Sequence, residues 1–433
     1  MKIAIQTLGC KVNQSESASL EGFLRNNKFE IVKYSDNPDV CIINTCTVTA
    51  KSDYQSRQLI RKAARSGAKV IATGCYAQLR PDELSKIEGL SFIIGNSGKD
   101  NLIPYLSALS DNCTISDESN NCRISISPPD GPLTYQPYYS SKSRALLKIQ
   151  DGCNFSCTYC TVPLARGRSR SLSKADIIAA ANMLVSDGYK EIVITGIHIG
   201  SYGLDLSPKT TLSYIVKCLA DHFPQIRIRL SSIEPQEFNN ELLKLIEDGS
   251  VCPHLHIPVQ SGSDNILKAM NRGYNTEYFK QIINNIITSC PDISIGTDLV
   301  IGFPGESDKD FYDTVNLINM LPLSYLHVFP YSKRPNTRAS LFTDQIKGKI
   351  KRERVNTIIG IGNIKKMNYI TSNIGRILDV IVEGKDDTNR YYKAISNNYL
   401  RLFVTSDNMN AGENHKVRVI SLTDIGLIAE PLK

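Results

Sequence analysis

Short apolar runs alternate with longer amphipathic stretches through the first quarter of the chain. The runs are KIAIQTLG, DVCIINTC, AKVIATGC and SFIIGNS, and the stretches between them include QSESASLEGFLRNN and KSDYQSRQLIRKAARSG. Buried parallel strands are continuous apolar runs, and the helices that connect them carry one apolar face. The pattern predicts an α/β multidomain protein that begins with a doubly wound parallel sheet over residues 1–108.

The alternation of apolar runs and amphipathic stretches stops after residue 108 and resumes at residue 143. Residues 109–142 lack periodicity and are rich in Ser, Asn, Asp and Pro, which is typical of a linker. Six strand candidates follow within residues 143–368: ALLKIQ, EIVITGI, IRIRLSS, HLHIPV, ISIGTDLVIG and YLHVFPY. Each of the first five precedes a helical stretch. Six units predict a partial (β/α)6 barrel, because a closed barrel of this kind has eight.

The last segment, residues 369–433, has short apolar runs separated by turn residues: GRILDVIVEG, YYKAISN, YLRLFVTSD, HKVRVISLTD and GLIAEPL. They predict a small antiparallel, OB-like β-barrel. Residues 331–433 carry 18 Lys and Arg against 10 Asp and Glu, whereas the whole chain has a net charge of only +7. A basic appended domain favours contact with a polyanion, although a solvated basic face gives the same excess.

The start of the chain, MKIAIQTLGC, lacks the apolar stretch and cleavage site of a signal peptide. No run approaches the roughly 18 apolar residues of a membrane span. We therefore expect a cytoplasmic protein with no membrane partner. The cytosol keeps thiols reduced, so clusters among the twelve cysteines point to metal binding or redox chemistry.

The segment CNFSCTYC places Cys153, Cys157 and Cys160 in a C-x3-C-x2-C run after the first barrel strand. A closed zinc site needs a fourth ligand, and the nearest histidine in sequence is His198. A 4Fe–4S cluster is held by cysteines alone, and three of them leave one iron open for another ligand. The spacing, at the barrel end where active sites lie, favours the iron–sulfur cluster.

Three further cysteines each follow a strand of the predicted N-terminal sheet, at Cys10, Cys46 and Cys75. The C-terminal ends of parallel strands meet along one edge, where helix N-termini favour thiolates. Asn13 and Glu16 have the spacing of a helix cap and its partner. The pattern predicts a joint site, with three separately buried cysteines as the alternative. We expect such isolated positions for Cys41, Cys218, Cys252 and Cys290, while Cys113 and Cys122 fall in the linker.

The triplet, with the aromatic Tyr159 before its last cysteine, resembles the radical S-adenosylmethionine (SAM) enzymes. In that superfamily the open iron chelates SAM, and an electron from the cluster cleaves SAM to a radical. The resemblance implies SAM contacts from Tyr159 and from Gly196, His198 and Gly200 in the loop TGIHIGSYG. Taken alone, that loop is an ordinary glycine-rich turn.

Two other segments offer polar groups near the predicted cofactor. Ser232 and Glu234 in SSIEP follow the third barrel strand, and a helix-capping role is their alternative. Arg166 in ARGRSR is a candidate SAM contact, with a surface role expected for at least one of this segment's arginines. His254 and His256 alternate on one strand and share a face, where packing is the more common role.

The whole chain resembles the methylthiotransferase family of radical SAM enzymes. This implies a second, auxiliary 4Fe–4S cluster on Cys10, Cys46 and Cys75, and a C-terminal TRAM domain that binds RNA. TLGCKVNQ and TGIHIGSYG resemble the branch that adds a methylthio group to C2 of N6-threonylcarbamoyladenosine, 3′ of the tRNA anticodon. The implied partners are the tRNA anticodon stem-loop, an electron donor such as flavodoxin or ferredoxin, and a sulfur source.

Three alternatives remain open from the sequence. One branch of the family carries out the same chemistry on N6-isopentenyladenosine, and another on a ribosomal protein aspartate. The second of these branches has the motif C-P-K-N at its first cysteine, where this chain has CKVN. A zinc-dependent RNA-binding protein without catalysis is the third. No catalytic residue is expected beyond the cluster ligands.

Overall fold

The computed structural model describes residues 1–110, 122–138, 143–406 and 408–432. Cys113 lies outside these ranges. The chain divides into two compact units. The first comprises residues 1–140, 148–172 and 332–337, and the second comprises residues 141–147, 173–331 and 338–433. Within the described ranges, no helix is both long and apolar enough to cross a membrane.

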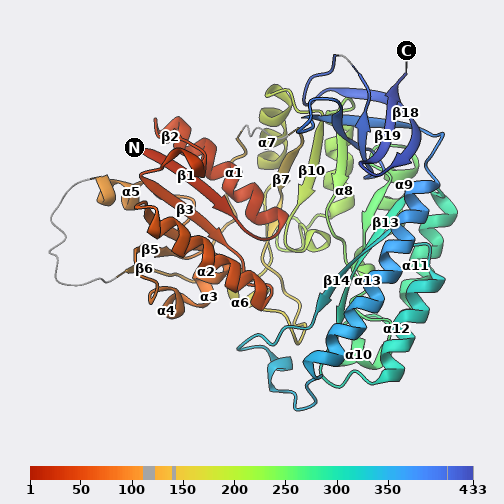
Figure 1. Ribbon diagram of the computed structural model, residues 1–433, viewed down its shortest axis with the longest axis horizontal. Helices are drawn as coiled ribbons and strands as arrows, with labels where there is room; N and C mark the ends of the chain where they lie inside the picture. Colours follow the sequence, from red (N-terminus) through yellow and green to blue (C-terminus); the bar gives the residue numbers. More distant parts are fainter. Residues whose placement is uncertain (111–121, 139–142, 407, 433) are drawn as a thin grey trace. The chain divides into compact units, whose positions relative to one another are not determined.

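The first unit contains a six-stranded parallel sheet, which confirms the predicted doubly wound domain (Figure 1). Its strands are β1 (Lys2–Thr7), β2 (Glu30–Ile31), β3 (Val40–Thr45), β4 (Lys69–Gly74), β5 (Leu90–Ile94) and β6 (Arg123–Ser125). Their order is β2-β1-β3-β4-β5-β6, so the direction of winding reverses between β1 and β3. Ligands of open parallel sheets bind at the carboxyl ends of the strands beside such a reversal.

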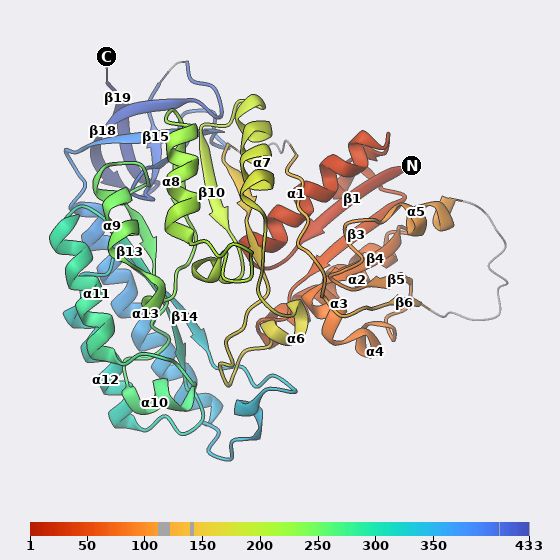
Figure 2. The same cartoon turned by 180° about the vertical axis from the view of Figure 1, so that it is seen from behind.

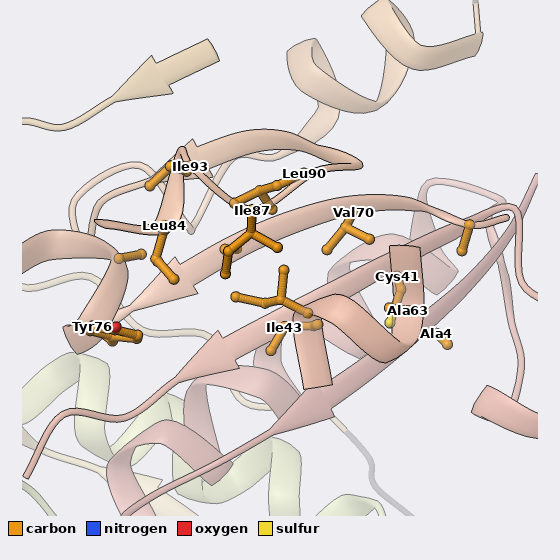
Figure 3. Packing of buried hydrophobic residues seen from close by; sticks show 14 residues of the cluster. Ala4, Cys41, Ile43, Ala63, Val70, Tyr76, Leu84, Ile87, Leu90 and Ile93 are labelled. Carbon is orange, nitrogen blue, oxygen red and sulfur yellow. The ribbon is translucent and has the colours of Figure 1, made fainter. Parts of the chain in front are cut away.

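Helices cover both faces of this sheet. One core packs α1 (Lys11–Asn26) and α5 (Ile103–Ser110) on side chains such as Ile42. The other packs α2 (Ala50–Arg65), α3 (Cys75–Leu79) and α4 (Pro81–Leu84) on side chains such as Ile43. Figure 3 shows the second core, where Cys41 is fully buried among apolar residues. Burial raises the pKa of the Cys41 thiol to about 12, as expected for an isolated structural cysteine.

The interval predicted to be a linker, 109–142, contains one strand of this sheet. Residues Arg123–Ser125 form β6, which pairs in parallel with Phe92–Ile94 of β5. An edge strand of three largely exposed residues has no apolar run, which is why the sequence pattern did not reveal it.

The second unit contains the predicted partial barrel. Its strands are β7 (Ala145–Lys148), β10 (Glu191–Thr195), β11 (Arg227–Leu230), β12 (His254–His256), β13 (Ser294–Ile301) and β14 (Tyr325–Pro330). They form two three-stranded sheets, β11-β10-β7 and β12-β13-β14, which single bridges join at Ile228–Val251 and Ser232–His256. Six strands are therefore present, in the positions that the apolar runs predicted.

The barrel helices, except the last, begin where the sequence supplies a cap. They are α7 (Lys174–Ser186), α8 (Leu212–His222), α9 (Asn240–Glu247), α10 (Asp264–Ala269), α11 (Thr276–Ser289), α12 (Asp308–Met320) and α13 (Gly348–Thr371) (Figure 2). A Ser, Thr or Asn side chain before each of α7–α12 accepts a hydrogen bond from a backbone N–H of the first turn. These caps satisfy backbone groups that otherwise lack partners.

Five strands form a closed C-terminal barrel in the order β15-β16-β17-β19-β18. They are β15 (Ile377–Lys385), β16 (Tyr392–Ser396), β17 (Arg401–Val404), β18 (Asn414–Thr423) and β19 (Gly426–Pro431). The antiparallel prediction holds except between β17 and β19, which pair in parallel where the barrel closes. Arg229 of β11 donates hydrogen bonds to the carbonyl groups of Ser396 and Asn397, which joins this barrel to the partial barrel.

Candidate metal and cofactor sites

The first cysteine group lies at the carboxyl ends of three adjacent strands. Cys10 follows β1 and precedes the first residue of α1, Cys46 follows β3, and Cys75 is the first residue of α3 after β4. Because β1, β3 and β4 are neighbours, these positions share the edge where the winding reverses. The structure therefore brings together three residues that are 36 and 29 positions apart in the sequence.

Glycines let the chain turn closely at this edge. A Cβ atom added to Gly9 would lie 2.9 Å from the Sγ atom of Cys46, and Gly9 has a φ of +104°. Gly74 has a φ of +93°, and its added Cβ atom would lie 2.5 Å from the carbonyl oxygen of Thr45. Only glycine adopts such angles without strain and leaves this space. The residues before Cys10 and Cys75 thus set the spacing of the cysteine group.

The thiols of this group also influence one another. Burial raises the pKa of the Cys46 thiol to about 11, and the nearby Cys75 and Cys10 add to the increase. Cys10 is exposed and Cys75 is half-buried, so the group has an open side. Three sulfur atoms from three strand ends, with the Cys10 side open to solvent, fit an iron–sulfur cluster whose fourth position is open.

The second cysteine group lies in a loop closed by a short antiparallel pair, β8 (Gln150–Asp151) with β9 (Arg170–Ser171). Backbone N–H groups point at two of its sulfur atoms. The N–H of Phe155 donates to Cys153 Sγ at 3.4 Å, and that of Val162 donates to Cys160 Sγ at 3.4 Å. Such bonds stabilise thiolates, and those to the sulfurs of a bound cluster tune its potential. The loop therefore fits an iron–sulfur cluster as predicted.

Arg166 joins the two cysteine groups. It ends α6 (Val162–Arg166), the helix that follows the second group, and it is only 1 % exposed. Its Nε atom lies 3.2 Å from Cys75 Sγ, its Nη1 atom 2.9 Å from Glu16 Oε1 and 3.0 Å from Asp151 Oδ1, and its Nη2 atom 2.6 Å from Asn13 Oδ1. Every nitrogen of the guanidinium is engaged within the first unit. The predicted contact of Arg166 with SAM stays a prediction.

The charges around Arg166 are buried and do not balance. Glu16 pairs with Lys99 at 2.5 Å and with Lys148 at 2.7 Å, and Asp151 pairs with Lys148 at 2.7 Å. Burial would raise the pKa of Glu16, but Arg166, Lys148 and Lys99 outweigh it and hold that pKa well below its usual range. Arg170 Nη2 also lies 3.9 Å from Asp151 Oδ2, so four cations face these two carboxylates. The surplus positive charge beside the cysteines favours bound thiolates and an anionic cluster.

The predicted helix cap at Asn13 is wrong. Helix α1 begins at Lys11, so Asn13 and Glu16 lie within it. The side-chain amide of Asn13 donates instead to the carbonyl oxygens of Leu8, at 2.7 Å, and Thr45, at 3.1 Å. These two carbonyls follow β1 and end β3, so Asn13 fixes the two strand ends that precede Cys10 and Cys46.

The loop after β10 in the second unit holds part of the predicted SAM site. His198 Nε2 lies 2.7 Å from Glu237 Oε1. A Cβ atom on Gly200 would lie 1.9 Å from Glu237 Oε2, so only glycine leaves room for that carboxylate. Gly196 directly follows the last residue of β10. The glycine-rich loop therefore places a buried histidine at the end of this strand, where it meets the carboxylate of Glu237 from the segment after β11.

The segment after β11 contains the other predicted SAM contacts. Glu234 precedes a short 3-10 helix, Pro235–Glu237, but its side chain makes no capping bond and pairs instead with Arg272. Burial raises the pKa of Glu234, and Arg272 only partly offsets this. Ser232 is exposed. The structure thus favours a polar ligand site over the capping alternative for Glu234.

Several buried polar atoms at these strand ends have no hydrogen-bond partner among the described residues. They include Thr195 Oγ1 at the end of β10, Ser231 Oγ just after β11, and Glu237 Oε2. An unpaired buried polar atom costs free energy, so such groups commonly bind a ligand or water. Sequence reasoning missed Thr195 and Ser231, although both are polar residues at the end of an apolar run. Together these atoms fit a polar cofactor such as SAM.

Comparison with known proteins decides the family. Residues 147–318 match the radical SAM superfamily, and residues 2–95 match a family described as uncharacterized protein family UPF0004. The threonylcarbamoyladenosine tRNA methylthiotransferase MtaB of Aquifex aeolicus is 37% identical, over 88% of this chain and 93% of its own length. This chain belongs to the radical SAM methylthiotransferase family.

Other members of the methylthiotransferase family give the same result. MtaB of Bacillus subtilis is 34% identical, over 96% of this chain and 93% of its own length. The tRNA-2-methylthio-N(6)-dimethylallyladenosine synthase of Clostridium botulinum is 30% identical, over 99% of this chain and 96% of its own length. Among solved structures, the radical SAM methyltransferase TsrM of Kitasatospora setae shares the fold, with a TM-score of 0.58, 14% identity and coverage of 78% of this chain and 74% of that one.

One more buried cation of this methylthiotransferase lies beside its first cysteine group. Arg334 Nη2 is 2.7 Å from Thr47 Oγ1 and 2.5 Å from Asp53 Oδ2, and Thr47 directly follows Cys46. Its Nε atom is buried with no partner among the described residues. Sequence reasoning missed Arg334 because the contact joins residues 287 positions apart, and no local pattern signals it.

Proposed function

We propose that this chain adds a methylthio group to C2 of N6-threonylcarbamoyladenosine at tRNA position 37, the nucleotide 3′ of the anticodon. The observation that carries the proposal is the match to the Aquifex aeolicus enzyme, which is 37% identical across 88% of this chain. The proposal places the protein in the cytoplasm, where its tRNA substrate is made.

We infer that two 4Fe–4S clusters serve this reaction. Cys153, Cys157 and Cys160 would hold one, and Cys10, Cys46 and Cys75 would hold the auxiliary one. When bound, the clusters and SAM supply the radical and sulfur-transfer chemistry. The N–H groups of Phe155 and Val162 orient the first set of thiolates, and Arg166 orients Cys75 in the second.

The residues proposed to contact SAM come from two places. Tyr159 lies in the loop of the second cysteine group, and Gly196, His198, Gly200, Ser232 and Glu234 lie after β10 and β11. Glu234 and Arg272 would bind the polar groups of SAM, and the glycines would allow its close approach to the backbone. The orphaned hydroxyl groups of Thr195 and Ser231 offer two further hydrogen bonds.

The C-terminal barrel is proposed to bind the anticodon stem-loop. Its exposed basic side chains include Lys385, Arg390, Arg401, Lys416 and Arg418. Such groups bind phosphates without regard to sequence, so the modified base itself must be recognised elsewhere. A base in a single-stranded loop is reached at lower cost than one in a duplex. A flavodoxin or ferredoxin is proposed as electron donor, together with a sulfur source.

The proposed substrate is tested by mass spectrometry of tRNA nucleosides from a strain that lacks this gene. We expect the methylthiolated threonylcarbamoyl nucleoside to disappear and its unmethylthiolated precursor to accumulate. The wild-type gene and a Cys218→Ala control, altered on helix α8, should restore it, whereas Cys75→Ala and Cys157→Ala should not. Loss of methylthiolated isopentenyladenosine instead, or an unchanged tRNA with altered ribosomal protein, would assign one of the two alternative substrates.

The colour of the purified protein distinguishes the proposed iron–sulfur enzyme from a non-catalytic zinc protein. The anaerobically purified chain should be brown with broad visible absorbance if it holds iron–sulfur clusters. A colourless protein that contains zinc and little iron would contradict the enzymatic proposal.

A further inference from the structure

Three potential metal ligands meet on three neighbouring strands of the partial barrel. These three strands contain no cysteine. They are His256 on β12, Asp298 on β13 and His327 on β14, and their ligand atoms all lie within 4.8 Å of one another. His256 Nε2 is 2.9 Å and His327 Nδ1 is 3.1 Å from Asp298 Oδ1. His256 is buried, Asp298 is partly exposed and His327 is exposed, so one side of the group is open.

The strand register produces this arrangement. Asp298 on the central strand is directly opposite His327 in the parallel pairing of β13 with β14. His256 is opposite Gly296, two residues before Asp298. Because side chains alternate between the faces of a sheet, residues two apart on one strand share a face. The three side chains therefore converge on the same face of β12, β13 and β14.

Tyr325 holds His256 in the orientation that a metal ligand needs. Its hydroxyl lies 3.2 Å from His256 Nδ1 and 2.9 Å from His254 Nε2. Tyr325 reaches them by crossing Gly296, where an added Cβ atom would lie 2.0 Å from the tyrosine Cζ atom. A partner at Nδ1 fixes the ring so that Nε2 faces Asp298 Oδ1, to which it donates a hydrogen bond that a bound ion would replace. Metal-binding histidines nearly always have such a partner on their second nitrogen.

We propose that His256, Asp298 and His327 form a binding site for one divalent transition-metal ion, with Zn²⁺ as the ion that fits it best. Zinc binds imidazole nitrogen and carboxylate oxygen at about 2.0–2.2 Å, so adjacent ligand atoms lie roughly 3–3.5 Å apart. The separations of 2.9 and 3.1 Å between Asp298 Oδ1 and the two histidine nitrogens are close to that spacing. Two neutral imidazoles and one carboxylate leave the ion a net positive charge, and three protein ligands leave a position open to water or to a substrate oxygen.

The proposal is tested by zinc binding to the full chain with its iron–sulfur clusters loaded, so that the cluster cysteines are occupied. Titration against a competing fluorescent zinc indicator should reveal one equivalent of bound Zn²⁺ that His327→Gln and Asp298→Asn both lose. His327 is exposed, so its replacement should leave the fold intact. Tyr325→Phe removes only the hydroxyl and should weaken zinc binding by about 10–100-fold.

Two controls keep the result specific. His222→Gln removes an exposed imidazole at the end of α8 and should bind zinc as the wild type does. X-ray absorption at the zinc edge should show nitrogen and oxygen ligands. No zinc uptake, equal uptake by all variants, or a sulfur-rich zinc environment would overturn the proposal. Zinc binding is measured without tRNA, so its failure leaves the proposed methylthiolation unaffected.

Discussion

The Nε atom of Arg166 lies 3.2 Å from the Sγ atom of Cys75. Arg166 ends the helix that follows Cys153, Cys157 and Cys160, whereas Cys75 belongs to the other cysteine group. One buried side chain therefore joins the loop of Cys153, Cys157 and Cys160 to Cys75, a proposed ligand of the auxiliary cluster. Burial would lower the pKa of Arg166, but Cys75 and the carboxylates that surround it raise that pKa instead, so the guanidinium stays charged.

Replacing Arg166 by alanine should destabilise the protein by about 3–5 kcal/mol, because it leaves the buried Glu16 and Asp151 without their partner. Chemical denaturation measures the loss. Arg168→Ala removes an exposed arginine from the same segment and should change the free energy of unfolding by less than about 0.5 kcal/mol. Equal effects of the two substitutions would refute the proposed role of Arg166.

A second readout isolates the bond to Cys75. Hydrogen bonds to cluster sulfurs stabilise the reduced, more negative cluster, so they raise its reduction potential. Arg166→Lys keeps the charge but loses the fixed fork of donors. In a redox titration followed by electron paramagnetic resonance, the auxiliary cluster of this variant should have a lower potential than that of the wild type.

Gly74→Ala should displace Cys75 and lower the occupancy of the auxiliary cluster. Its added methyl group would lie 2.5 Å from both Asn44 Oδ1 and the Thr45 carbonyl oxygen, at a φ of +93°. Gly67 offers a matched control, because its φ is +85° and no atom lies within 4 Å of an added Cβ. Gly67→Ala should therefore cost only about 1 kcal/mol of backbone strain and leave the iron content unchanged. Iron analysis of both variants provides the comparison, and equal iron contents would argue against the role of Gly74.

The sequence predicted the features that follow from the pattern of apolar runs, namely the positions of strands and of the residues at their ends. Cys10, Cys46 and Cys75 each follow an apolar run, and strand ends meet in any parallel sheet, so their proximity was predictable. The strand positions in both barrels were predictable for the same reason. The short edge strand β6 and the parallel pairing of β17 with β19 were not, because neither depends on a local apolar pattern.

The contacts that depend on long-range packing were not predictable. ARGRSR contains three arginines, and nothing local shows that Arg166 is buried while Arg168 is exposed. Arg166 contacts Glu16, which is 150 residues away in the sequence. Asn13, which was predicted to cap a helix, instead donates hydrogen bonds to the carbonyl groups at two strand ends. The approach of His256, Asp298 and His327 depends on strand register, which the sequence alone does not specify.

Glu191 should make the stability of the second unit depend on pH. Burial raises its pKa, but Arg229 and Arg227 outweigh this and lower it to about 2. A folded-state pKa below the unfolded value near 4.3 stabilises the protein above about pH 4.3, and the contribution is lost as the pH falls toward 2. It amounts to about 3 kcal/mol.

Glu191→Gln should therefore be less stable than the wild type at pH 7 and should lose less stability between pH 5 and pH 3. Denaturation at several pH values, followed through the C-terminal barrel, measures both effects. Glu247→Gln, at an exposed position in α9, is the control and should retain the wild-type slope. The same slope in Glu191→Gln and the wild type would contradict the prediction.

Lys416 and Arg418 should contribute to tRNA affinity through phosphate contacts. Both are exposed on β18, and they share a face because they are two residues apart. Replacing both by alanine should weaken binding and reduce the dependence of log K on log salt concentration by about two. Lys217→Ala on α8, which removes an exposed lysine of the partial barrel, should leave the salt dependence unchanged. An unaltered slope in the double variant would place the tRNA contact on another surface.

The iron content of the anaerobically reconstituted protein tests most directly whether two cysteine groups hold two clusters. The wild type should contain about eight irons, because each three-cysteine group binds one 4Fe–4S cluster. The combined variant Cys10→Ala/Cys46→Ala/Cys75→Ala should retain about four, and Cys218→Ala should retain the wild-type content. An unchanged iron content in the combined variant would contradict the auxiliary cluster and the two-cluster enzyme built upon it.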